Sequence, residues 1–242
     1  MSRREPIVNA PTVLLVLIAL FVLVQVARGF LTDYQDAYTM LALGFIPGRY
    51  GDELFDFPGG PLAAATSPVT HMFVHGDWFH LAINSAWLLA FGAPIVRRIG
   101  TFRFLLFALV CGIGGAVTFL AINPGLMVPM VGASGAISGL MGGLMRFMFR
   151  AIDQGGINSL QGGAPDVPRM DLGEMLADRR VILTIAIWVA LNFIFSFGFG
   201  DVAELGSIAW EAHLGGFFTG LLTFGLFDRQ PQSRPSSQPP EG

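Results

Sequence analysis

Residues 131–139 read VGASGAISG, a run of small side chains that opens a short apolar segment in a strongly hydrophobic sequence. Ser134 has glycines close by on both sides, so another backbone or a substrate can come within bonding distance of its hydroxyl. Gly135, Gly139 and Gly143 are spaced four residues apart, a pattern that equally fits the close packing of two membrane helices. Taken alone the run favours helix packing. A nucleophilic role for Ser134 depends on what the rest of the chain places beside it.

The composition is typical of an integral membrane protein. Of the 242 residues, 53% are hydrophobic and 13% are charged, and several apolar runs are long enough to cross a bilayer. The net charge of −3 and the lack of a basic, aromatic-rich cluster exclude a nucleic-acid partner. The single cysteine, Cys111, lies within an apolar run, so no intrachain disulfide is expected.

The hydrophobic pattern predicts an all-α integral membrane bundle with six spans, of which the fourth is short and begins inside the bilayer. A cytoplasmic segment at 1–10 and a disordered Pro-, Ser- and Gln-rich tail at 229–242 flank the membrane domain at 11–228. Residues 32–70 are predicted to form a long loop with interfacial apolar pieces, and 150–180 a polar loop without regular structure. The predicted spans cover residues 11–31, 77–96, 102–122, 134–149, 181–199 and 210–227.

The arginines predict the orientation of the chain, because cationic residues near span ends are retained on the cytoplasmic side. With six spans, only Arg28 and Arg49 fall on the outer side, and both termini are cytoplasmic. The remaining arginines share the cytoplasmic side: Arg3, Arg4, Arg97, Arg98, Arg103, Arg146, Arg150, Arg169, Arg179, Arg180, Arg229 and Arg234.

In this topology the second, fourth and sixth spans all start at the outer face, and each has polar residues in its opening turns. These residues are His80 and Asn84, then Ser134, then His213. They lie about 18 to 26 Å from the nearest cytoplasmic arginine at about 1.5 Å per residue, in a hydrocarbon core about 30 Å thick. All four are expected in one layer of the outer half, where polar groups are functional candidates by default.

These polar residues suit acyl transfer. A serine hydroxyl is a poor nucleophile until a base takes its proton, and His213 can do this for Ser134 and later protonate the leaving amine. The Ser134 backbone N–H, the Asn84 amide and a ring N–H of His80 are candidate oxyanion donors. No intramembrane carboxylate is placed to orient His213, so the sequence predicts a dyad rather than a triad.

Glycines offer a way of bringing the serine and the histidine together. Gly216 and Gly220 follow His213 on its own helix face, and contact with the glycine face of the fourth helix would aim the imidazole at the hydroxyl. The glycines assigned to packing near the site are Gly132, Gly135, Gly139, Gly216 and Gly220.

Three motifs, in this order on the second, fourth and sixth spans, resemble those of the rhomboid family of intramembrane serine proteases. They are HLAIN at 80–84, GASG at 132–135 and AHLGGFFTG at 212–220, similar to the family's H-x-x-x-N, G-x-S-G and A-H-x-x-G-x-x-x-G patterns. The resemblance covers the core from about residue 11 to 228, and it implies a six-span bundle of rhomboid type.

The resemblance also implies roles and a setting. Ser134 is expected as the nucleophile and His213 as the base, with His80, Asn84 and the Ser134 N–H as the oxyanion hole. The implied substrate is a single-span membrane protein, cut near the outer end of its helix without a cofactor. The implied location is a bacterial inner membrane. Because water must reach a serine below the membrane surface, we also expect an active site that opens to the outer face, with the segment at 195–209 as a mobile lid.

The chain departs from the family pattern at three places. The Trp-Arg pair common in the family's first loop is missing from residues 32–70, so the anchoring of this loop must differ. Val96 replaces a usual glutamate. Ser138 stands where bacterial members often have an aromatic side chain stacked on the base.

Other interpretations compete with a serine protease. His71, His75 and His80 could suggest a metal site, but the glutamate of H-E-x-x-H is missing and no metal is expected. The letters GFGD at 198–201 resemble an aspartyl protease element, yet no second intramembrane aspartate is present to share a proton. A transporter would more often show inverted repeats or mid-membrane acidic residues. A non-catalytic protein of the same fold that binds membrane helices stays open as the alternative.

Overall fold

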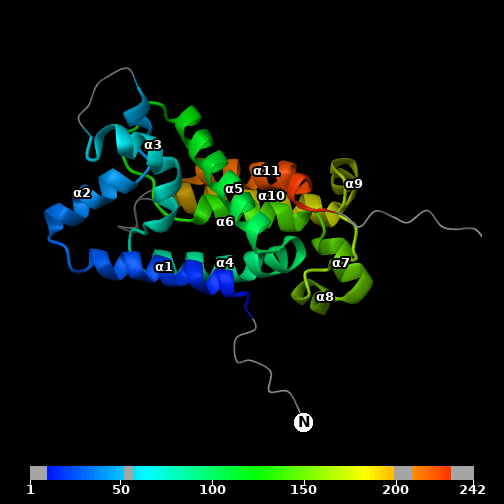
Figure 1. The fold of residues 1–242 in the computed structure, drawn as a ribbon. Helices are drawn as coiled ribbons and strands as arrows, with labels where there is room; N and C mark the ends of the chain where they lie inside the picture. Colours follow the sequence, from blue (N-terminus) through cyan, green and yellow to red (C-terminus); the bar gives the residue numbers. More distant parts are fainter. Residues whose placement is uncertain (1–9, 52–56, 199–208, 230–242) are drawn as a thin grey trace, which may run out of the picture.

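The computed structural model describes residues 10–51, 57–198 and 209–229, which form a bundle of helices (Figure 1). The predicted all-α class is confirmed for this part of the chain, where the sole pairing of extended backbone is one isolated bridge between Phe45 and Met130. The predicted terminal segments at 1–9 and 230–242, and most of the predicted lid, lie outside the described residues. The principal helices are α1 (Thr12–Arg28), α4 (Trp78–Ile99), α5 (Thr101–Ile122), α6 (Ser134–Met145), α10 (Arg179–Gly198) and α11 (Trp210–Phe227).

Two of these helices, α4 and α5, are long and apolar enough to cross a membrane when the described residues are considered, and α1 and α6 are shorter apolar helices. Local signals set their ends. The Asp77 side chain accepts a hydrogen bond from the His80 backbone N–H at 2.7 Å and so caps the start of α4. Gly100, at φ +78°, separates α4 from α5 with a backbone conformation that glycine adopts without strain.

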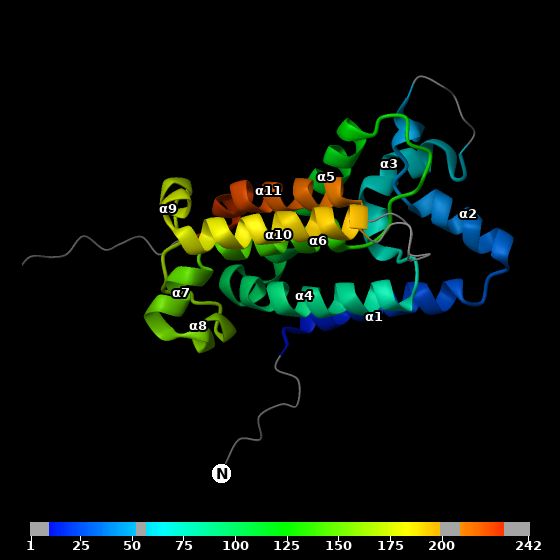
Figure 2. The ribbon, with the colours of Figure 1, turned by 180° about the vertical axis from the view of Figure 1, so that it is seen from behind.

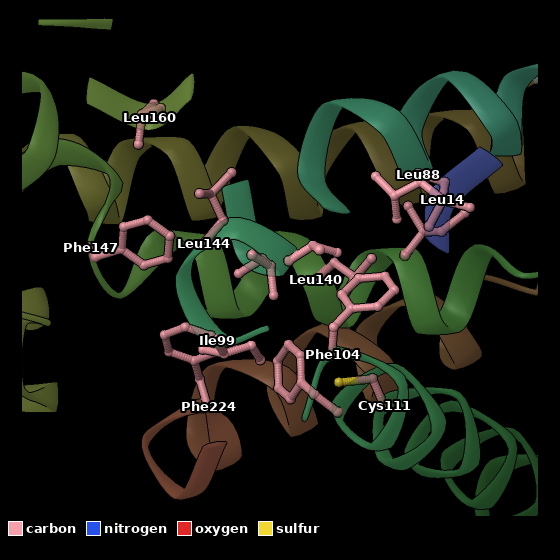
Figure 3. Packing of buried hydrophobic residues seen from close by; sticks show 14 of the residues in the cluster. Leu14, Leu88, Ile99, Phe104, Cys111, Leu140, Leu144, Phe147, Leu160 and Phe224 are labelled. Carbon is pink, nitrogen blue, oxygen red and sulfur yellow. The ribbon is translucent and has the colours of Figure 1, made fainter. Parts of the chain in front are cut away.

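Helix α6 lies at the centre of the bundle, in contact with α4, α5 and α11, and Figure 2 shows α11 above α6, α4 below it and α10 in front of it. The half of α6 that ends at Met145 is packed tightly. Leu140 and Leu144 of α6 belong to one buried cluster with Phe104 and Cys111 of α5 and Phe224 of α11 (Figure 3). Burial of these apolar side chains fixes α6 against both neighbours.

The fourth span was predicted to continue to residue 149, and this boundary is wrong. Helix α6 ends at Met145, and a separate helix, α7 (Met148–Gly155), follows. The buried guanidinium of Arg146 donates to the Met170 and Leu221 carbonyls, both at 2.9 Å, which holds the chain in place as it turns. The residues after this turn are apolar again, so the hydrophobic pattern of the sequence does not reveal it.

Residues 150–180 were predicted to lack regular structure, and this is also wrong. They contain most of α7, then α8 (Ile157–Gln161) and α9 (Leu172–Ala177). The glycines taken as helix breakers lie at helix boundaries, and α9 starts with a capping box between Asp171 and Glu174.

A buried ion pair fastens this segment to the bundle. Arg98 at the end of α4 binds Asp228, just beyond α11, at 3.0 Å, and donates to the Ala164 and Val167 carbonyls. The same guanidinium lies 4.3 Å from the ring centroid of Phe147. The end of α4 beyond Val96 is therefore held to the end of α11 and to the segment at 150–180. This contact does not require the glutamate that is usual in the family in place of Val96.

The segment at 32–70 is folded as well, into α2 (Asp33–Leu43), a 3₁₀ turn at Pro47–Tyr50 and α3 (Gly60–Thr70). Arg28 at the end of α1 forms an ion pair with Asp36 of α2 at 2.7 Å. Arg49 donates to the Leu41 carbonyl at 2.6 Å and to the Pro58 carbonyl at 3.3 Å. Two arginines thus anchor a loop that lacks the family's Trp-Arg pair.

Candidate active site

The Ser134 hydroxyl and the His213 imidazole form a hydrogen bond, with 2.8 Å between Oγ and Nε2. Ser134 is the first residue of α6, and His213 lies in the first turn of α11. The two residues are 79 positions apart, and both begin helices at the same end of the bundle. A hydroxyl and a ring nitrogen at this distance can exchange a proton directly.

Backbone-to-backbone contact between α6 and α11 makes this distance possible. A Cβ atom added to Gly216 would overlap the Gly135 carbonyl oxygen, and one added to Gly220 would overlap the Gly139 carbonyl oxygen. Any larger residue at these places would force the helices apart. The glycine spacing on α11 therefore brings His213 within reach of the serine at the start of α6.

His80 and Asn84 of α4 lie against the backbone that leads into Ser134. Gly132 has φ +111°, and a Cβ atom there would be 2.7 Å from His80 Nε2 and 3.6 Å from Asn84 Nδ2. The Gly132 N–H donates to the His71 carbonyl at 2.9 Å, which fixes this stretch of backbone. Gly132 thus contacts the two polar side chains and takes no part in the α6–α11 contact.

The hydrogen bonds of these two side chains show which of their N–H groups face the site. The Gly76 N–H donates to His80 Nδ1 at 3.4 Å, so a neutral ring carries its proton on Nε2, on the side of Gly132. Asn84 is buried, and its Nδ2 donates to the His80 carbonyl at 3.1 Å. An amide nitrogen has two protons, which leaves one N–H of Asn84 for another acceptor.

The sequence analysis missed one residue that contacts the site. Asn192 of α10 approaches His213 from the side opposite Ser134, with 2.8 Å between Oδ1 and Nδ1. The prediction of a dyad took only carboxylates as groups that could orient His213. The available signal was an amide in the middle of an otherwise apolar span, where polar groups are costly and mark function.

Other polar candidates lie elsewhere. Glu211, two residues before His213, accepts a hydrogen bond from Asn123 at 3.0 Å. The His71 ring bonds the Ser67 carbonyl at 2.9 Å, and the His75 ring packs against that of His80. Where the structure is described, no three His, Cys, Asp or Glu side chains are grouped to hold a metal ion.

Comparisons with known proteins agree on one family. Residues 64–229 match the family model described as "Rhomboid domain". RHOMBOID-like protein 4 of Arabidopsis thaliana is 30% identical over 155 residues, which make up 62% of this chain and 31% of that protein. Rhomboid protease GluP of Bacillus subtilis (strain 168) is 38% identical over 77 residues, or 32% of this chain and 15% of that protein.

A third relative matches a longer part of the chain. RHOMBOID-like protein 6, mitochondrial, of Arabidopsis thaliana is 26% identical over 169 residues, which make up 68% of this chain and 44% of that protein. The chain spans less than half of the length of each of these three relatives. The match to the family model includes all the residues of the candidate site, from His80 to His213.

Proposed function

The chain belongs to the rhomboid family, and from this premise we propose that it is an intramembrane serine endopeptidase that uses Ser134 and His213 as a catalytic dyad. The observation that supports this most directly is the 2.8 Å hydrogen bond between the serine hydroxyl and the imidazole. Family membership supports an intramembrane protease in general. The assignment to these two residues rests on the geometry around Ser134.

In the proposed reaction, Ser134 Oγ attacks the scissile carbonyl carbon while His213 Nε2 takes the hydroxyl proton. The imidazolium then gives this proton to the leaving amine, and an acyl-enzyme forms. His213 next takes a proton from a water molecule, which attacks the ester and releases the second product. One base therefore serves both half-reactions.

Three N–H groups are proposed to stabilise the negative charge that develops on the carbonyl oxygen. The Ser134 backbone N–H is free of intrahelical bonding because this residue begins α6, and the helix dipole there favours negative charge. Asn84 offers its second amide N–H, and His80 its Nε2–H, beside Gly132. Donors held in place before the reaction cost no reorganisation when charge develops.

The proposed setting is a bacterial inner membrane, crossed six times, with both termini in the cytoplasm. Arg97 and Arg98 end α4, at the opposite end of that helix from His80. Arg146 and Arg150 follow α6, whose other end is Ser134. These arginines thus lie at the end of the bundle opposite the proposed site, which supports a site near the outer face under the positive-inside rule.

The proposed substrates are single-span membrane proteins, cut near the outer end of their transmembrane helix. A test is cleavage of a fluorescent single-span reporter by the purified full-length protein in liposomes. We expect cleavage by the wild type, loss of cleavage in Ser134→Ala and in His213→Ala, and near wild-type cleavage in Ser138→Ala, a matched serine one turn along α6.

A serine-directed fluorophosphonate gives a second test that needs no substrate. We expect a covalent adduct that maps to Ser134 and that fails to form in His213→Ala. Cleavage that persists in both dyad variants would contradict the proposal. Absence of both cleavage and adduct in the wild type would instead favour a non-catalytic protein that binds membrane helices.

A further inference from the structure

We propose that Asn192 is a positioning residue for the general base, with its side-chain amide fixing both the tautomer and the ring orientation of His213. This inference rests on the proposed serine protease function. It concerns a residue of α10 that none of the three sequence motifs contains. Asn192 is a group that can orient His213, and it is an amide rather than the carboxylate that a triad would have.

Two hydrogen bonds decide the direction in which the Asn192 amide points. Asn192 Nδ2 lies 2.9 Å from the Trp188 carbonyl oxygen, which can only accept, so the NH₂ group must face Trp188. The amide oxygen must then face His213 Nδ1, at 2.8 Å. Exchanging the amide oxygen and nitrogen would place Oδ1 against the Trp188 carbonyl oxygen, and two acceptors cannot form a hydrogen bond.

The amide orientation in turn decides the state of the imidazole. An amide oxygen can only accept, so His213 Nδ1 must carry a proton. In a neutral ring, Nε2 is then a lone-pair acceptor, and it lies 2.8 Å from the Ser134 hydroxyl. This is the tautomer that a general base needs, and the carbonyl of Trp188 specifies it through Asn192.

Aromatic contacts on both sides of Asn192 hold α10 against α11 at this level. Trp188 stacks on Phe217 with ring centroids 4.4 Å apart, and Phe193 packs on Trp210 at 4.8 Å. Such pairs prefer defined ring geometries and add to the stability of the contact. The amide is thereby kept at hydrogen-bonding distance from the base.

The choice of an amide has a physical reason. A carboxylate at this depth in a membrane is costly, whereas an uncharged amide orients the ring without a buried charge. Ser134 and Asn192, both uncharged, contact the His213 ring from α6 and α10. A carboxylate in place of the amide would favour the protonated imidazolium and so move the acid limb of the pH–rate profile to higher pH.

The competing explanation is that Asn192 only links α10 to α11. Steady-state cleavage of the single-span reporter across a pH series distinguishes the two. For Asn192→Ala we expect kcat to fall about tenfold or more, the effect of losing one hydrogen bond in the transition state, with KM unchanged. Leu191→Ala, on the adjacent half-exposed side chain, is the matched control and should retain wild-type kcat.

Asn192→Asp keeps an oxygen acceptor, and it is expected to retain activity but to shift the acid limb to higher pH. A side chain at position 192 that does not contact the His213 ring would leave this limb in place. Wild-type kcat in Asn192→Ala, or an unchanged acid limb in an active Asn192→Asp, would overturn the proposal.

A spectroscopic measurement tests the inference without any activity. ¹⁵N-histidine NMR of the full-length protein reports the protonated nitrogen of each ring, with His213 assigned from its missing signals in His213→Ala. We expect Nδ1 protonation in the wild type and a mixture of tautomers in Asn192→Ala. A single Nδ1–H tautomer in both would overturn the role of Asn192, whereas an inactive wild type with the expected spectra would overturn only the protease function.

Discussion

Gly216 of α11 lies directly against the carbonyl of Gly135 in α6, next to the hydrogen bond between Ser134 and His213. Gly135 follows the serine by one residue, and Gly216 follows the histidine by three, which is about one helical turn. The distance between the two functional groups is therefore coupled to a backbone contact that admits no side chain.

Gly216→Ala tests this coupling. The new methyl group would overlap the Gly135 carbonyl, so the helices must separate at a cost of about 1 to 3 kcal/mol. We expect a lower thermal unfolding temperature and at least a tenfold slower reaction of Ser134 with a fluorophosphonate. Gly125→Ala is the control, because a Cβ atom at Gly125 meets nothing within 4 Å. Equal labelling rates in the two variants would contradict the prediction.

Asn84→Ala removes one of the proposed oxyanion donors. Loss of a single donor typically lowers kcat by about 100-fold or more, and we expect an effect of this size with KM little changed. Cleavage kinetics of the liposome reporter provide the measurement. Asn123→Ala is the matched control, since the Asn123 amide binds Glu211 at 3.0 Å and does not contact the dyad. Similar kcat values in the two variants would exclude Asn84 from the oxyanion hole.

Arg98→Ala should destabilise the protein strongly, because the Asp228 carboxylate stays buried but loses its ion pair with Arg98. The side chains of this pair are 2% and 4% exposed, and breaking a buried pair costs about 3 to 5 kcal/mol. Thermal unfolding in detergent would measure the loss. Arg180→Ala, which breaks an exposed pair with Asp153, should leave the unfolding temperature nearly unchanged. A combined Arg98→Met and Asp228→Leu variant should recover much of the stability lost in Arg98→Ala.

Acid pH should destabilise the fold through His71. Burial lowers the pKa of His71 to about 4, below its ordinary value of 6.5, so the unfolded chain binds a proton that the folded protein excludes. The resulting decrease in the free energy of unfolding is absent above about pH 6.5, grows as the pH falls, and levels off below about pH 4. In His71→Gln we expect a shallower decline of the unfolding temperature between these pH values. Parallel declines in the wild type and the variant would argue against this residue.

The membrane class and the family could be predicted from the sequence, and both are confirmed. Apolar runs mark helices whatever surrounds them, because each must satisfy its backbone internally in lipid. The letters of the three motifs identified the family, and the structure brings Ser134 and His213, 79 residues apart, to 2.8 Å. Their roles in catalysis remain the proposal that the experiments above test.

The helices at 150–180 could not be predicted, since they depend on distant partners. Glycine pairs normally indicate turns, and they do end the short helices here. One of the contacts that hold this segment in place is made by Arg98, 66 residues before Ala164 and 130 residues before Asp228. No local pattern shows that a guanidinium at the end of α4 will bind carbonyls and a carboxylate so far along the chain.

The sequence by itself determined which residues are polar inside apolar helices and which glycines permit close approach. Only the tertiary structure decided that Asn192 meets His213, because this contact depends on the rotation and depth of α10 beside α11. Those two quantities follow from the packing of Trp188 on Phe217 and of Phe193 on Trp210. Hydropathy records that a helix is buried in lipid, whereas side-chain packing decides which of its faces meets the neighbouring helix.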